Sequence, residues 1–89
     1  MEEIESIEET TVGLLGGQRV PMGNVTRGSY TLPDGAEAQG WICALALPTG
    51  GAVFVGAGSE VEIAGRHWTV LKVEKEPGKL GQVFLRSER

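Results

Sequence analysis

Apolar and polar residues alternate with a period of two over much of this 89-residue chain, and this spacing predicts β-strands. The strand prediction is strongest over residues 40–47. The period of two predicts one face with Trp41, Cys43, Leu45 and Leu47 and an opposite face with Ile42, Ala44 and Ala46. Because both faces are apolar, we expect a central strand that is covered on both sides.

Turn residues divide the rest of the second half of the chain into four further strands. These strands are predicted at residues 52–55, 60–63, 66–74 and 82–86. We expect the strand at 66–74 to be the longest in the molecule. In the strand at 60–63, Val61 and Ile63 should face the interior while the two glutamates between and before them face water.

The first half of the chain is less regular. It predicts extended segments at 10–15, 18–26 and 30–32, a loop at 24–29 and a turn at 33–35. A Gly16-Gly17 pair separates the first two segments. Pro21 lies within the second, and because proline cannot donate a hydrogen bond to a ladder, we expect it at a sheet edge or a bulge.

The first nine residues differ from the rest in charge. Five of them are glutamates, so they account for the net charge of −4, and the remainder of the chain is nearly neutral. Ile4 and Ile7 are three residues apart, which permits a short helix, but so short a helix is marginal alone in water. We expect residues 1–9 to be an acidic, flexible tail and residues 10–89 to form a single domain.

These patterns predict an all-β fold: one small antiparallel β-sandwich or partly open barrel of six to eight short strands. Fourteen glycines in 89 residues fit many turns and few helices. Much of the core should come from the inward-facing residues Trp41, Cys43, Leu45, Leu47, Val53, Val55, Val61, Ile63, Val70, Val73, Val83 and Leu85.

Composition also bears on the compartment. Cys43 is the only cysteine, so no intramolecular disulfide can form, which favours a reducing compartment. The acidic N-terminus is the reverse of a signal peptide, and we predict a cytoplasmic protein. The uncharged run from residue 38 to 59 is long enough to span a bilayer, but proline and four glycines break it into two strands, so no membrane association is expected.

Residues suited to catalysis are sparse. His67 is the only histidine and has no second metal ligand at suitable spacing, so we expect neither a metal nor a cofactor. Cys43 lies on an apolar face, where burial should raise its pKa and leave it inert. A Cys43–His67 dyad would require the two strands to pair face to face. Glu60 and Glu62 share a strand face but should be solvated. We therefore expect no enzymatic activity.

The C-terminal third offers a candidate interaction surface. From residue 64 onward, six basic residues stand against three acidic ones, and aromatic residues lie among them. This resembles in miniature the basic, aromatic groove that holds single-stranded nucleic acid. The alternative is an unpaired strand edge or an apolar patch around Phe54, Trp68 and Phe84 that binds another protein. The candidate surface residues are Phe54, Arg66, His67, Trp68, Lys72, Lys75, Phe84 and Arg86.

We rank binding of another protein above binding of nucleic acid. The overall pI is near 4.9, whereas domains that bind nucleic acid usually carry a strongly basic footprint. The sequence therefore predicts a non-enzymatic protein-interaction or assembly module that contacts another protein or a second copy of itself. Nucleic-acid binding through the basic C-terminal hairpin remains the alternative.

One pattern resembles known families. It is Gly58-x-x-Val61-x-Ile63-x-Gly65-x-x-Trp68-x-Val70-x-x-Val73, followed after a glycine-containing loop by Val83-x-Leu85. The pattern resembles the closing hairpin of small uncharacterised bacterial all-β proteins, and a similar one occurs in phage head-completion proteins. The resemblance implies an all-β fold and a bacterial or phage origin, and it supplies no catalytic residues.

Overall fold

The structure is a computed structural model that describes residues 2–88. These residues form eight strands: β1 (Glu2–Glu8), β2 (Thr11–Leu15), β3 (Gln18–Thr31), β4 (Glu37–Ala46), β5 (Ala52–Gly56), β6 (Glu60–Ile63), β7 (Arg66–Glu74) and β8 (Gln82–Glu88). Among these residues no helix is long and apolar enough to cross a membrane.

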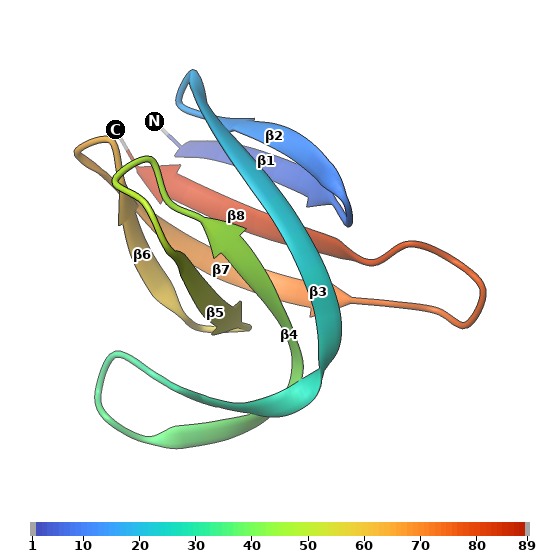
Figure 1. The fold of residues 1–89 in the computed structure, drawn as a ribbon. Coiled ribbons are helices and arrows are strands. Elements are labelled where there is room, and N and C mark those ends of the chain that lie inside the picture. Colours follow the sequence, from blue (N-terminus) through green and yellow to red (C-terminus); the bar gives the residue numbers. More distant parts are fainter. Residues whose placement is uncertain (1, 89) are drawn as a thin grey trace.

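The strands form two four-stranded antiparallel sheets that pack face to face (Figure 1). The order β1-β8-β7-β6 makes up one, which we call the terminal sheet because it contains the first and last strands. The other, the central sheet, has the order β2-β3-β4-β5. The predicted all-β fold is confirmed, and the arrangement is that of a small, open β-sandwich.

The core lies between the two sheets. Of the predicted core residues, Cys43, Leu45, Val55, Ile63, Val70, Val73, Val83 and Leu85 are buried, and Trp41, Leu47, Val53 and Val61 are partly buried against them. The prediction omitted six further buried residues of this core between the sheets: Ile7, Leu15, Val20, Met22, Val25 and Trp68. Burial of these side chains by both sheets supplies the main favourable term in folding.

Residues 2–8 form a strand, so the prediction of a flexible acidic tail is wrong for them; Met1 lies outside the described residues. β1 pairs with β8 along its whole length, from Glu2 opposite Glu88 to Glu8 opposite Gln82. Alternation turns Ile7 inward, where its side chain is 2% exposed. Ladder hydrogen bonds and this burial outweigh the charge of the segment.

β1 and β2 close one side of the sandwich. Gly13 of β2 lies so near β1 that a Cβ atom there would meet Cγ1 of Ile7 at 2.3 Å. The absence of a side chain at this position therefore lets the edges of the two sheets approach.

Glu9 links three segments beside this closed side. Its buried carboxylate accepts hydrogen bonds from Lys75 Nζ at 2.8 Å, from the Gly81 N–H at 3.0 Å and from the Val25 N–H at 3.2 Å. The hydrogen bond from Lys75, followed by that from Gly81, lowers the pKa of Glu9 below its usual value. Glu9 thus holds the β1–β2 connection, β3 and the β7–β8 loop together.

β3 is a single strand of 14 residues, whereas we predicted a loop at 24–29 and expected β7 to be the longest strand. A register shift between Gly23 and Thr26 absorbs the irregular stretch, and Asn24 takes a positive φ of 55° there. Such a bulge bends a strand without ending it. Pro21 pairs with Val12 of β2 but not with β4, because the β3–β4 register begins at Met22.

The β3–β4 hairpin extends past the sandwich and curls toward the β5–β6 turn (Figure 1). The Tyr30 hydroxyl donates to the Ala57 carbonyl at 2.7 Å, and the Tyr30 ring lies against Gly56. Ile42, on the outer face of β4, is buried beside Gly28. The expectation that β4 is covered on both faces is right at Ile42, but Ala44 and Ala46 farther along remain partly exposed.

Candidate interaction surfaces

The residues suited to catalysis do not meet. Cys43 is buried on the inner face of the central sheet, and desolvation, followed by the nearby charge of Glu9, raises the pKa of its thiol to about 12. His67 is exposed on the terminal sheet, so the structure contradicts a Cys43–His67 dyad. Within residues 2–88 no group of three or more His, Cys, Asp or Glu side chains could hold a metal ion.

The predicted basic surface is neutralised wherever the structure describes it. Each of its cations has a carboxylate within 4 Å: Arg66 with Glu3 (2.9 Å), Lys75 with Glu9 (2.8 Å), Lys79 with Glu76 (3.2 Å), Lys72 with Glu74 (3.4 Å) and Arg86 with Glu2 (3.9 Å). Arg89 lies outside the described residues. Three of these carboxylates come from the segment expected to be a flexible tail, because β1 pairs alongside β8.

The predicted aromatic patch is dispersed. Trp68 is 0% exposed, so its assignment to the surface is wrong; it lies in the core with the Arg66 guanidinium 4.9 Å from its ring centroid. Phe84 lies on the outer face of the terminal sheet, with Lys72 Nζ 4.8 Å from its ring centroid. Phe54 lies on the central sheet and is 54% exposed. The three aromatic residues therefore share no surface.

The outer faces of the two sheets differ in charge. Register and alternation place charges of both signs on the outer face of the terminal sheet, from Glu2, Glu60, Glu62, His67, Lys72, Glu74, Arg86 and Glu88. The outer face of the central sheet carries one charged residue near its end, Arg19, opposite Leu14. The rest of that face is uncharged, and we call its following apolar residues the apolar face: Val12, Leu14, Pro21, Ala44, Ala46, Ala52 and Phe54.

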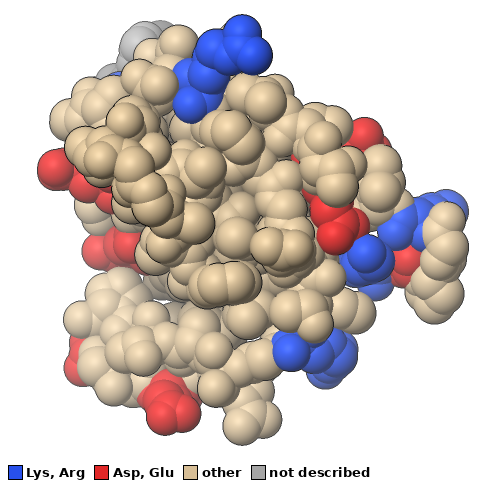
Figure 2. All heavy atoms as spheres, in the orientation of Figure 1, with Lys and Arg blue, Asp and Glu red and all other residues tan. Residues whose placement is uncertain are grey.

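The apolar face is exposed. Leu14 is 58% and Val12 46% exposed at one side of the central sheet, and Phe54 is 54% exposed at the other. The small residues Ala44, Ala46 and Ala52 lie beside Phe54, so side chains protrude little from this part of the face. Figure 2 views the molecule from the side of β2, β3 and β4 and shows a broad uncharged area, with most charged side chains around its margin.

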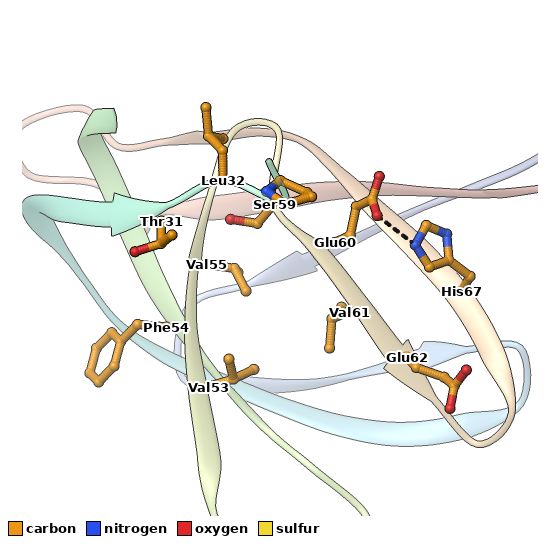
Figure 3. Close-up of a pocket in the computed structure, with 11 residues that line it drawn as sticks. Thr31, Leu32, Val53, Phe54, Val55, Ser59, Glu60, Val61, Glu62 and His67 are labelled. Carbon is orange, nitrogen blue, oxygen red and sulfur yellow. Dashed lines mark hydrogen bonds and ion pairs between the residues drawn. The ribbon is translucent and has the colours of Figure 1, made fainter. Parts of the chain in front are cut away.

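A groove lies between β5 and β6 on the side of the sandwich opposite β1 and β2 (Figure 3). Its volume is about 390 Å³. Val53, Val55 and Val61 line it from the two strands. Glu60 lies on the β6 side, where its carboxylate is 3.0 Å from His67 Nε2. Thr31, Leu32 and Pro33 of the curled hairpin also line the groove.

Both strands beside the groove are sheet edges, because within residues 2–88 β5 pairs with β4 alone and β6 with β7 alone. In an antiparallel ladder, residues that exchange hydrogen bonds with the neighbour alternate with residues whose N–H and C=O point away. The Leu47 N–H donates to the Gly51 carbonyl, which sets this alternation on β5 and turns the backbone groups of Ala52 and Phe54 outward.

The same alternation applies to β6. The Val70 N–H donates to the Ser59 carbonyl, so the backbone groups of Glu60 and Glu62 point away from β7. Where the two strands converge, the Gly56 N–H donates to Ser59 Oγ at 3.0 Å. This contact satisfies the last outward N–H of β5 and closes that end of the groove.

Sequence reasoning identified Phe54 as exposed and missed the rest of the apolar face. Ala44 and Ala46 were assigned to a covered face because an apolar strand face was equated with burial. The signal available in the sequence was their small size, since the buried positions of the same strand hold larger side chains such as Leu45.

Comparison of the chain with protein-family models, with curated proteins and with solved structures finds no match. The resemblance of its C-terminal hairpin to small bacterial all-β proteins and to phage head-completion proteins therefore stays a prediction.

Proposed function

We propose that this chain is a non-enzymatic protein-interaction module whose apolar face docks onto a flat, uncharged surface of a protein partner. The observation that carries the proposal is the contrast between the outer faces of the two sheets. Soluble monomers rarely expose contiguous apolar patches of more than a few hundred Å², and larger ones mark interaction sites. The outer face of the terminal sheet carries charges of both signs, which suits contact with water.

The composition of the apolar face suggests how it docks. Low Ala44, Ala46 and Ala52 allow another sheet or helix to approach closely, while Phe54 and Leu14 rise at its two sides. Full burial of a leucine or phenylalanine side chain contributes about 1.5–3 kcal/mol. Arg19 is the one charged residue of the face, so a strongly charged partner surface would be poorly matched.

The arrangement of charges favours a protein over a nucleic acid as the partner. A surface that binds nucleic acid needs unopposed cations to displace counterions from phosphates. The described cations of the C-terminal third each lie beside a carboxylate, and the most exposed apolar area lies on the other sheet. Both observations support the protein-interaction function.

The chain offers a matched pair of substitutions as a test. Leu14→Lys places a charge within the apolar face, and Ile4→Lys does the same on the terminal sheet, where Ile4 is 56% exposed. Crosslinking and capture from native lysate, combined with light scattering after size exclusion, would measure partner binding and self-association for wild type and both variants.

We expect wild type and Ile4→Lys to form the same complex and Leu14→Lys to lose it. Surface substitutions usually change stability by less than about 0.5 kcal/mol, so loss of binding should occur without unfolding. A complex that all three proteins form equally, or the absence of any complex with wild type, contradicts the proposal. A second copy of the chain and a different protein are the two partners that the measurement distinguishes.

A further inference from the structure

We propose that the groove between β5 and β6 is a second interaction site, which takes an extended peptide segment of a partner as an additional strand along β5. The segment would alternate apolar and basic side chains. This site is distinct from the apolar face, although Phe54 borders both. Binding at the groove pairs backbone groups of a partner with β5, whereas docking on the apolar face buries side chains only.

The backbone of β5 supplies the first part of the argument. Ala52 and Phe54 point their N–H and C=O groups away from β4, and no strand of residues 2–88 pairs with that edge. Such an edge is a template for a further strand, whose own backbone groups would complete the ladder. The other side of the sandwich is closed by β1 and β2, where Ile7 fills the space above Gly13.

The groove determines the inward side chains of the bound segment. A strand added to β5 would direct every second side chain between the sheets, onto Val53, Val55 and Val61 (Figure 3). These valines form an apolar floor, so apolar side chains are required at those positions. The Ser59 contact to Gly56 closes one end, which limits pairing to the part of β5 around Ala52 and Phe54. A segment of about four to six residues fits that length.

The rims of the groove determine the outward side chains. On the β6 side, Glu60 and Glu62 are exposed carboxylates, and on the β5 side stands the exposed ring of Phe54. A lysine or arginine of the segment that projects toward the β6 rim would place its charge beside these carboxylates. Among the described residues that line the groove, His67 is the one basic residue, and it pairs with Glu60. Basic side chains therefore match this rim and acidic ones do not.

Three acetylated and amidated hexapeptides test this inference. The first has the alternating sequence Val-Lys-Val-Lys-Val-Lys, the second has the same composition in blocks, Val-Val-Val-Lys-Lys-Lys, and the third replaces each lysine of the first with glutamate. Titration into labelled wild-type protein, followed by amide chemical shifts and hydrogen exchange, reports both affinity and location. We expect the alternating lysine peptide to bind most tightly, to shift Ala52, Phe54 and Glu62, and to slow exchange of the Phe54 amide.

A charge-reversed protein provides the second test. In the double variant Glu60→Lys/Glu62→Lys, the alternating glutamate peptide should replace the lysine peptide as the preferred ligand. Each reversed charge should weaken lysine-peptide binding by about two- to fivefold, the range measured for exposed ion pairs. Glu8→Lys is the matched control, because Glu8 is an exposed glutamate on the opposite side of the sandwich, and it should bind like wild type.

Several results would overturn the inference. Equal binding of the alternating and blocked lysine peptides would mean that charge alone, without strand pairing, holds the ligand. Shifts at Val12 and Leu14 in place of β5 would place the peptide on the apolar face, and protection of β5 by self-association without peptide would assign the groove to a second copy. If the alternating lysine peptide still binds Leu14→Lys but no longer binds Glu60→Lys/Glu62→Lys, the groove is a site separate from the apolar face.

Discussion

Replacing Glu9 with glutamine tests how much the fold depends on a single buried carboxylate. The substitution keeps the size of the side chain but removes the charge that accepts hydrogen bonds from Lys75, Gly81 and Val25. A glutamine amide has one acceptor oxygen, so at least one of the two backbone N–H donors is left without its carboxylate oxygen, and the Lys75 ion pair is lost.

The magnitude follows from these contacts. A hydrogen bond to a charged group contributes about 1.5–3 kcal/mol, and a buried donor left unsatisfied costs about 1–3 kcal/mol. Allowing for partial relaxation and for water reaching Lys75, whose side chain is about a third exposed, we expect Glu9→Gln to lower the free energy of unfolding by about 2–3 kcal/mol. Urea denaturation at pH 7 measures this value, with Glu8→Gln as an exposed neighbouring control that should lie within about 0.5 kcal/mol of wild type.

The effect should also depend on pH. Because folding lowers the pKa of Glu9, its ionised form stabilises the folded state above the usual glutamate pKa of 4.5, and this contribution is lost as pH falls through the lowered value. The difference in stability between wild type and Glu9→Gln should therefore be full at pH 7 and shrink below about pH 4.5. A variant as stable as wild type at pH 7, or a difference that does not change with pH, would refute the role assigned to this carboxylate.

Three further predictions concern single side chains. Ile7→Ala should destabilise the protein by about 2–4 kcal/mol in urea denaturation because Ile7 is buried. Ile4→Ala should have little effect because Ile4 is exposed, and equal effects of the two substitutions would contradict the pairing of residues 2–8 as a strand. Cys43 should not react with a thiol reagent at pH 8 until the protein unfolds, and rapid labelling of the native protein would refute its burial. Desolvation and the neighbouring Glu3 raise the pKa of Glu5, so ionisation of Glu5 disfavours folding. Glu5→Gln should therefore raise the free energy of unfolding at pH 7 but not below about pH 4.5. A lower free energy of unfolding at pH 7 would contradict this prediction.

Local patterns predicted the parts of the fold that depend on neighbouring residues. The β4–β5 hairpin follows from the turn residues at 48–51, and the β6–β7 hairpin from Ala64-Gly65, both with positive φ as a tight two-residue turn requires. Residues 2–8 could not be assigned in this way, because their partner strand lies at the other end of the chain. The residues that hydrogen-bond to β1 therefore lie outside any local window of sequence around it.

The candidate surfaces were predicted less well than the fold. Trp68 shares its strand face with Val70, which was assigned to the core, so alternation already indicated that Trp68 is buried. The cations of the C-terminal third were counted in sequence without the carboxylates that β1 brings beside them. The outer face of β4 is covered at Ile42, beside Gly28 of the β3–β4 hairpin, and not at Ala44 and Ala46, and alternation along β4 does not encode that limit.

The pairing of β1 with β8 has a consequence for synthesis on the ribosome. β1 is translated before β8, with the other six strands between them, so the edge of β1 waits unpaired until almost all of the described chain has been made. Long-range pairing of this kind slows folding and leaves nascent strands open to aggregation. The glutamates spaced along β1 repel other nascent chains during that delay, so the same charges that make this segment look disordered protect it until its partner emerges.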